Sequence, residues 1–169
     1  EKIIAIARSK SHQLKTLKLS RKSLIVVLEE PEKPGNIGAL YRTAAAAKID
    51  AIIISNPKTD FYNPNSIRSS LGDIFKIPTA IESNENVVSF LKKREFNIYT
   101  TFIKLDSVRY DEFDYQLPCA LIIGSESEGL SNFWLKVASE NLVIPMAKTS
   151  NSLNLSVSAG ILIYEACLL

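Results

Sequence analysis

The stretch that decides the fold is NLVIPMAKTSNSLNLSVSAGILIYEACLL, residues 141–169. Residues 141–146 form an apolar run that predicts a strand, and residues 147–154 form a loop rich in hydroxyl, amide and ammonium groups. Apolar residues then recur every three or four positions, as expected for a buried helix: Leu153, Val157, Ile161, Tyr164 and Leu168. Ser152 and Asn154 stand at the start of this helix, where such side chains are typical N-caps.

Similar apolar runs occur throughout the preceding chain. They predict strands over residues 23–28, 51–55, 74–81, 97–102 and 119–124. Between them lie helical patterns, over residues 39–48, 66–71, 86–94 and 132–138. This alternation predicts an α/β domain with a mostly parallel sheet of about five or six strands and helices on both faces. Pro78 removes a backbone donor, which favours an edge position for its strand.

The bulk composition is that of a single globular domain. The chain has 169 residues, of which 46% are hydrophobic and 22% are charged. No apolar run reaches the ~18 residues that a membrane span needs, and no signal-peptide pattern is present. We therefore expect a cytoplasmic protein without membrane contact.

Metal and disulfide chemistry find no support in the sequence. Cys119 and Cys167 lack metal-ligand spacing and stand in apolar surroundings, so both are predicted to be buried free thiols in a reducing compartment. His12 stands alone in a basic, polar stretch and is predicted to be a solvated surface residue. We expect no metal site.

Positive charge gathers at the start of the chain. The net charge is only +2, yet residues 1–22 carry seven basic residues against the single acid Glu1: Lys2, Arg8, Lys10, Lys15, Lys18, Arg21 and Lys22. Basic arms of this kind often contact nucleic acid. A solvated linker is an equally good interpretation of the charge alone.

Three motifs stand at predicted strand ends, where ligands bind in parallel sheets. They are NxGxxxR (Asn36, Gly38, Arg42), GxExxGL (Gly124, Glu126, Gly129, Leu130) and IPM…SLNxS (Ile144 to Met146, Ser152 to Asn154, Ser156). Each is a weak signal alone, because a glycine-containing turn also suits a capped helix or a plain loop. The first motif lacks both the GxGxxG spacing of dinucleotide sites and the GK[ST] of a P-loop.

Taken together and in this order, the motifs resemble those of the SpoU, or TrmH-like, class of SPOUT RNA methyltransferases. The resemblance runs over residues 23–169 and implies a catalytic domain with a C-terminal deep trefoil knot. It also implies S-adenosylmethionine (AdoMet) as cofactor, a homodimer, and methyl transfer to a ribose 2′-hydroxyl. Residues 1–22 would then be a basic arm or linker from a substrate-recognition domain that is missing here.

The resemblance also implies roles for individual residues. It assigns AdoMet binding to Thr101, Gly124, Ile144, Met146 and Leu153. It assigns catalysis to Arg42, acting at the hydroxyl, and to residues that position that hydroxyl or the RNA backbone: Asn36, Glu126, Ser152 and Asn154. Arg42 is either a base or a phosphate clamp, and a guanidinium group rarely gives up its proton. Lys148 replaces a glycine that most relatives have, so the loop either takes another path or gains a phosphate contact.

The identity of the RNA is less constrained. Residues 60–78 look more like the relatives that modify large-subunit rRNA, so we expect rRNA as substrate. The alternatives are a tRNA 2′-O-methyltransferase, or a non-catalytic module that binds RNA or AdoMet. A generic nucleotide-binding protein is disfavoured by the missing phosphate-loop signatures.

Overall fold

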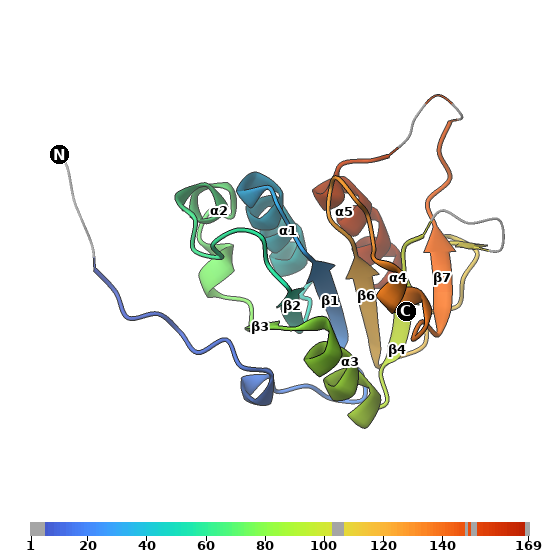
Figure 1. Cartoon of the computed structure of the whole chain (residues 1–169), viewed down its shortest axis with the longest axis horizontal. Coiled ribbons are helices and arrows are strands. Elements are labelled where there is room, and N and C mark those ends of the chain that lie inside the picture. Colours follow the sequence, from blue (N-terminus) through green and yellow to red (C-terminus); the bar gives the residue numbers. More distant parts are fainter. Residues whose placement is uncertain (1–5, 103–106, 148, 150–151, 168–169) are drawn as a thin grey trace.

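The fold is an α/β sandwich around one parallel sheet, as seen in a computed structural model that describes residues 6–102, 107–147, 149 and 152–167 (Figure 1). The sheet has seven strands in the order β3-β2-β1-β6-β4-β7-β5, and every pair is parallel. The strands are β1 (Leu24–Glu29), β2 (Ala51–Ser55), β3 (Thr79–Glu82), β4 (Asn97–Thr100), β5 (Val108–Arg109), β6 (Cys119–Ile123) and β7 (Glu140–Val143). The predicted α/β class is confirmed.

Helices cover both faces of the sheet, and each face has its own apolar cluster. The α-helices are α1 (Pro34–Ala46), α2 (Pro64–Ser69), α3 (Asn84–Lys93), α4 (Asn132–Leu135) and α5 (Leu155–Ala166), and the 3-10 helices are η1 (Leu14–Thr16) and η2 (Asp73–Phe75). Alternate residues of β1 point to opposite faces: Val26 packs with α1 and α5, whereas Val27 packs with α3 and α4. The fully buried Trp134 of α4 belongs to the second cluster.

The strands differ from the prediction most clearly at β3, β7 and β5. β3 starts only after Pro78, because residues 73–75 form η2 and residues 76–78 connect it to the strand, but it is an edge strand as predicted. β7 ends at Val143, so Ile144 and Met146 belong to the following loop. The two-residue strand β5 lies in a polar segment where no strand is predicted, and it brings the sheet to seven strands.

Helix α1 begins earlier than its alanine-rich stretch suggests. Pro34 is the first helical residue, where a missing N–H costs nothing, so the Gly-containing segment 35–38 is the first turn of the helix and not a loop before it. Gly38 faces α2, and a Cβ there would lie 1.9 Å from Ser69 Oγ. This close approach explains why glycine occupies the position.

Helix α5 is capped by Asn154, whose side chain accepts a hydrogen bond from Ser156 N (2.9 Å). Its buried face is not the predicted stripe. Val157 and Tyr164 are 50% and 51% exposed, and the core is contacted by Leu155, Ala159, Leu162, Ile163 and Ala166. The helix is apolar on most sides, so the spacing alone did not identify the face that packs inward; Leu168 lies outside the described residues.

The N-terminal arm contacts the domain from Lys10 onward, where Lys10 Nζ donates to Phe75 O. His12 O accepts from Ile81 N (2.8 Å), and the His12 ring bonds Thr79 O and Tyr62 Oη. Leu17 is buried against the α3 face of the sheet. His12 is therefore half-buried and bonded, and its prediction as a solvated residue was wrong.

The structure also bears on the predictions for the two cysteines and for membrane-spanning helices. Cys119 is buried, as predicted. Cys167 is exposed, so the prediction that it is buried was wrong. Among the described residues, no helix is long and apolar enough to cross a membrane. The trefoil knot stays a prediction.

Candidate functional site

A cavity of about 490 Å³ opens at the carboxyl ends of the strands. Its walls come from the segments that follow β4, β6 and β7 and from the start of α5. The lining residues are Thr101, Phe102, Ile123 to Leu130, Leu142 to Ile144, Met146, Ser152, Leu153, Leu155 and Ser158. All five residues assigned to the cofactor by the motif resemblance are among them, whereas Lys148 lies outside the described residues.

Three motif residues form one hydrogen-bonded chain beside this cavity. Asn36 Nδ2 donates to Glu126 Oε1 (2.7 Å), and Asn154 Nδ2 donates to Asn36 Oδ1 (3.0 Å). A carboxylate only accepts, so Asn36 must turn its amino group to Glu126 and its oxygen to Asn154. Asn154 Oδ1 then accepts from Ser156 N and Ser156 Oγ (2.9 and 2.7 Å). The direction of every bond in the chain is fixed by its acidic end.

The loop after β6 holds Glu126 through close backbone contact. Ser125 and Gly129 exchange both backbone hydrogen bonds (3.1 Å each), which folds the loop back on itself. A Cβ on Gly124 would lie 2.1 Å from the carbonyl carbon of Gly129, so only glycine permits this approach. Gly129 adopts a φ of 69°, a left-handed conformation that also favours glycine.

The far end of the same loop is held by a buried carboxylate that the motifs did not reveal. Glu29, at the end of β1, is only 2% exposed. Its oxygens accept from Ser131 N (2.7 Å), Ser131 Oγ (2.6 Å) and Asn84 Nδ2 (2.6 Å). Ser131 is the N-cap position of α4 and follows the cavity-lining Leu130 directly. An acid immediately after a buried strand is the sequence signal that marks such a group.

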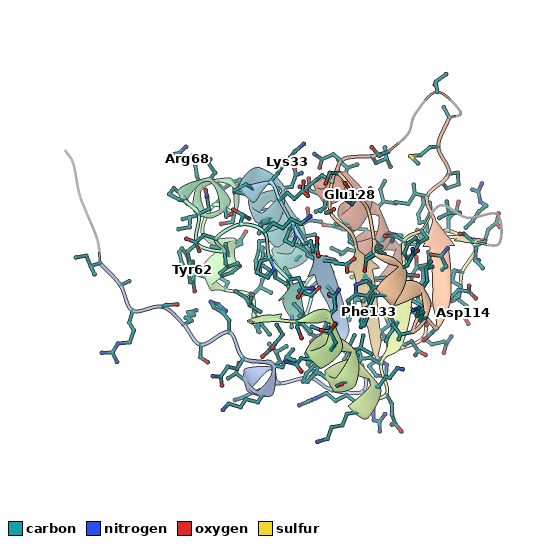
Figure 2. The ribbon with its side chains drawn as sticks, viewed as in Figure 1. Lys33, Tyr62, Arg68, Asp114, Glu128 and Phe133 are labelled. Atoms are coloured by element: carbon teal, nitrogen blue, oxygen red, sulfur yellow. The ribbon has the colours of Figure 1, made fainter. Side chains whose placement is uncertain are left out.

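A second acidic side chain links three loops at the surface. Glu32 Oε1 accepts from Ser127 Oγ (2.7 Å) and from Lys58 Nζ (3.2 Å), while Glu32 N donates to Glu126 Oε2 (3.3 Å). The Ser127 hydroxyl and the Lys58 ammonium lower the pKa of the Glu32 carboxyl below its usual value. Lys33 follows Glu32 in the sequence, and Glu128 follows Ser127. Figure 2 shows Lys33 and Glu128 at the same edge of the sheet.

The remaining predicted residues occupy different places. Ser152 lines the cavity, but its side chain is exposed and Asn154 alone caps α5. Arg42 lies on α1, six residues beyond Asn36. Its side chain is exposed and is not among the described residues that line the cavity. Thr101 Oγ1 donates to Ile122 O (3.1 Å), which ties the segment after β4 to β6.

The arrangement suits recognition and alignment of organic groups. Apolar side chains and peptide groups line the cavity, and a directed polar chain stands beside it. No group of three or more His, Cys, Asp or Glu side chains within the described residues is placed to hold a metal ion.

Comparison with known proteins agrees with this geometry. The model of the SpoU rRNA Methylase family matches residues 23–164. The chain belongs to this family. The sequence is 30% identical to the 23S rRNA (uridine(2479)-2′-O)-methyltransferase of Streptomyces viridochromogenes, over 97% of this chain and 59% of that protein. It is 31% identical to the 23S rRNA (guanosine(2553)-2′-O)-methyltransferase of Bacillus subtilis, over 88% of this chain and 59% of that protein.

A solved structure of the SpoU family shows the same architecture. The SpoU methyltransferase AviRb from Streptomyces viridochromogenes, in complex with the cofactor AdoMet, superposes with a TM-score of 0.87 at 30% identity. The likeness covers 94% of this chain and 65% of that one. The chain thus spans less than two thirds of the length of the relatives named here.

Proposed function

We propose that this chain is the catalytic domain of an AdoMet-dependent enzyme that methylates a ribose 2′-hydroxyl of RNA. The observation that carries the proposal is the union of three distant motifs, in which Asn36, Glu126 and Asn154 form one chain beside the cavity. Membership of the SpoU family and the names of the two 23S rRNA 2′-O-methyltransferases support the same activity.

The cavity fits AdoMet in size and in chemistry. Its volume of about 490 Å³ lies within the roughly 300–1,000 Å³ that small-ligand sites occupy. Leu142, Ile144 and Leu153 offer apolar contact for the flat faces of an adenine, and the peptide groups around Gly124 offer partners for its edges. When bound, AdoMet supplies an electrophilic methyl group. We therefore keep Thr101, Gly124, Ile144, Met146 and Leu153 as the proposed cofactor residues.

The polar chain provides the alignment that a hydroxyl nucleophile requires, and the phosphate held by Arg42, or a water, takes its proton. A 2′-hydroxyl reacts only when it is aligned and its proton has an acceptor. Glu126 anchors the chain, because both of its oxygens accept hydrogen bonds from the first motif and from Glu32 N. Asn36 and Asn154, held in one orientation, are assigned to positioning the ribose or the adjacent phosphate. Ser152, exposed at the rim of the cavity, has the same proposed role.

Arg42 is assigned to the RNA phosphate. Its side chain is exposed on α1, and an arginine keeps its proton at neutral pH, so it suits a bidentate contact with an anion better than the role of a base. Replacement by lysine keeps the charge and removes the planar fork. Arg42→Lys should therefore lower methyl transfer strongly, and near-normal turnover would contradict both the phosphate clamp and an arginine base.

Large-subunit rRNA is the proposed substrate, because both relatives named above act on 23S rRNA. A tRNA 2′-hydroxyl presents the same chemistry and is the alternative substrate. A non-catalytic module of the same fold is disfavoured, because the polar chain is complete. We place the protein in the cytoplasm, where these RNAs are. Residues 1–22 are proposed to link the catalytic domain 23–169 to a further recognition domain.

We further propose that the chain acts as a homodimer through the exposed face of α5. Val157 and Tyr164 are about half exposed on this face, and Leu153 at its start is 38% exposed. Scattered apolar residues are ordinary, but a row along one helix suits a partner surface. Tyr164→Glu should convert a dimer to a monomer in analytical ultracentrifugation. Leu71→Glu, at another exposed apolar residue, is the matched control and should leave the mass unchanged.

The activity itself is tested by two measurements. Calorimetry should show binding of AdoMet but not of ATP or NAD. Incubation with labelled AdoMet should place the label on rRNA rather than on tRNA, and mapping would then identify the nucleotide. Absence of binding to both AdoMet and its demethylated product would refute the proposed function. Label on tRNA alone would retain the chemistry and replace the substrate.

A further inference from the structure

The side chain of Asn141 bridges two strands beyond the point where their backbone pairing stops. β4 and β7 pair through Tyr99 with Glu140 and Thr100 with Asn141, and β4 ends there. The chain then continues into Thr101 and Phe102, which line the cavity. These two residues have left the sheet, so something other than a strand must hold them.

The Asn141 amide takes the place of the missing strand. Its Oδ1 accepts from Phe102 N (2.8 Å) and from Thr100 Oγ1 (3.1 Å). Its Nδ2 donates to Phe102 O (3.2 Å) and to Ser107 Oγ. Both backbone groups of Phe102 are thus bonded to one side chain, in the way that a neighbouring peptide group would bond them. Only a primary amide combines an acceptor with two donors in this arrangement.

A second anchor holds the same segment from the opposite side. Thr101 Oγ1 donates to Ile122 O of β6 (3.1 Å), whereas Asn141 belongs to β7. The cavity is lined on the β6 side by Ile123 and on the β7 side by Leu142. The segment 101–102 is therefore fixed between two strands whose next residues form the other walls of the cavity.

We infer that Asn141 is a positioning residue that sets the Thr101–Phe102 wall of the AdoMet pocket. The inference rests on the proposed function for the identity of the ligand. Asn141 itself does not line the cavity, so it acts through the backbone of Phe102. Loss of its donor groups would remove the Asn141 bond from Phe102 O, which also accepts from Ser107 Oγ (3.0 Å), and the wall would move without any change in the residues that touch the ligand.

Asn141→Asp is the decisive variant, because it preserves shape and replaces the amino group by an oxygen. At pH 8 the carboxylate faces Phe102 O, and we expect the dissociation constant for AdoMet to rise roughly tenfold. The facing carbonyl oxygen Phe102 O disfavours the charged form and so raises the pKa of this new carboxyl. At pH 5 a larger share of it is protonated and regains a donor, so the ratio of the variant's constant to that of the wild type should fall. Asn141→Ala has no group to protonate, and its loss should be the same at both pH values. Calorimetry with AdoMet measures all three proteins.

Asn97→Asp is the matched control at the opposite end of β4. Asn97 Nδ2 also donates to backbone carbonyls, Gln116 O (2.9 Å) and Pro118 O (3.4 Å), but far from the cavity along the same strand. This variant should lower the melting temperature and leave AdoMet affinity unchanged at both pH values. The control therefore separates a loosened sheet from a displaced pocket wall.

The outcomes are distinct. Weaker binding by Asn141→Asp at pH 8, with recovery at pH 5, supports the inference. Wild-type affinity in both Asn141 variants overturns it, and so does an equal loss of affinity in Asn97→Asp. If the wild type itself binds no AdoMet, the proposed function fails and the inference falls with it. Should Asn141→Asp be unfolded at pH 8, binding by the folded Asn141→Ala variant decides.

Discussion

The two ends of the sheet use polar side chains in different ways. At the amino ends of the strands, side chains complete the backbone pairing next to them, as when Asp50 Oδ2 accepts from Leu24 N (2.9 Å). At the carboxyl ends, Asn141 does the same for Phe102, but other side chains bond to side chains from distant segments, as in the chain of Asn36, Glu126 and Asn154. The first kind of bond finishes a sheet, and the second kind fixes loops relative to one another. Stability and function should therefore separate by position.

The largest effect is expected for Asn36→Asp at the carboxyl end. The new carboxylate would stand where Asn36 Nδ2 lies 2.7 Å from Glu126 Oε1, so two negative charges would replace a hydrogen bond. We expect kcat/KM for methyl transfer to fall roughly 100-fold, equivalent to about 2.7 kcal/mol of transition-state stabilisation. The melting temperature should change little, because Asn36 is only half-buried. Turnover close to wild type would show that the polar chain is not part of the site.

The next largest effect is expected for Gly124→Ala. It compares two glycines that both lie near the carboxyl ends of the strands. Gly124→Ala places a Cβ 2.1 Å from the backbone of Gly129, so the loop must shift. We expect AdoMet affinity to fall roughly tenfold or more, measured by calorimetry. Gly35→Ala is the matched control, since a Cβ there meets nothing within 4 Å, and it should bind AdoMet normally. Equal losses in both variants would argue against a specific role for the loop.

Glu29→Gln tests a side chain that makes both kinds of bond, one to a backbone N–H and two to other side chains. Glu29 is buried and accepts three hydrogen bonds, and a glutamine keeps only one acceptor oxygen for them, so at least one of these bonds is lost or its partner must turn. Chemical denaturation should show a loss of about 1–3 kcal/mol in unfolding free energy. Because Ser131 follows the cavity-lining loop, AdoMet affinity should fall as well. A loss of stability with unchanged AdoMet affinity would show that Glu29 contributes to stability alone.

The smallest effect is expected at the amino end. Asp50→Ala removes the acceptor for Leu24 N and should cost about 1 kcal/mol of unfolding free energy. AdoMet affinity and kcat should remain those of the wild type, because Asp50 lies at the opposite end of the strands from the cavity. A decrease in kcat at full occupancy of both substrates would break the separation between the two ends.

The sequence predicted the motif residues of the site, but it did not reveal the side chains that hold the surrounding loops in place. Spacing placed strands before Asn36, Glu126 and Asn154, and parallel strands bring their carboxyl ends together, so the joint site was predictable. Glu29 and Asn141 were missed because their partners lie at least 34 positions away along the chain, and several of them are backbone groups. Neither belongs to a motif, and an isolated acid or amide beside a strand has many ordinary explanations.

Two local errors have physical reasons. The helix predicted over residues 39–48 begins earlier, because proline is favoured at the first helical position and α1 starts at Pro34. On α5, one apolar stripe was chosen from a helix that is apolar on most sides, and the other face proved to be buried. In both cases, which face or turn is used depends on neighbouring elements that local spacing does not describe.

The contact between His12 and β3 has a consequence for aggregation. β3 is an edge strand, and its outward Thr79 O and Ile81 N are both occupied by His12. An uncovered edge offers such groups to another chain and invites intermolecular strand pairing. A catalytic domain cut at the boundary suggested by the family motifs, residue 23, would expose this edge. The basic arm thus also keeps the sheet from growing.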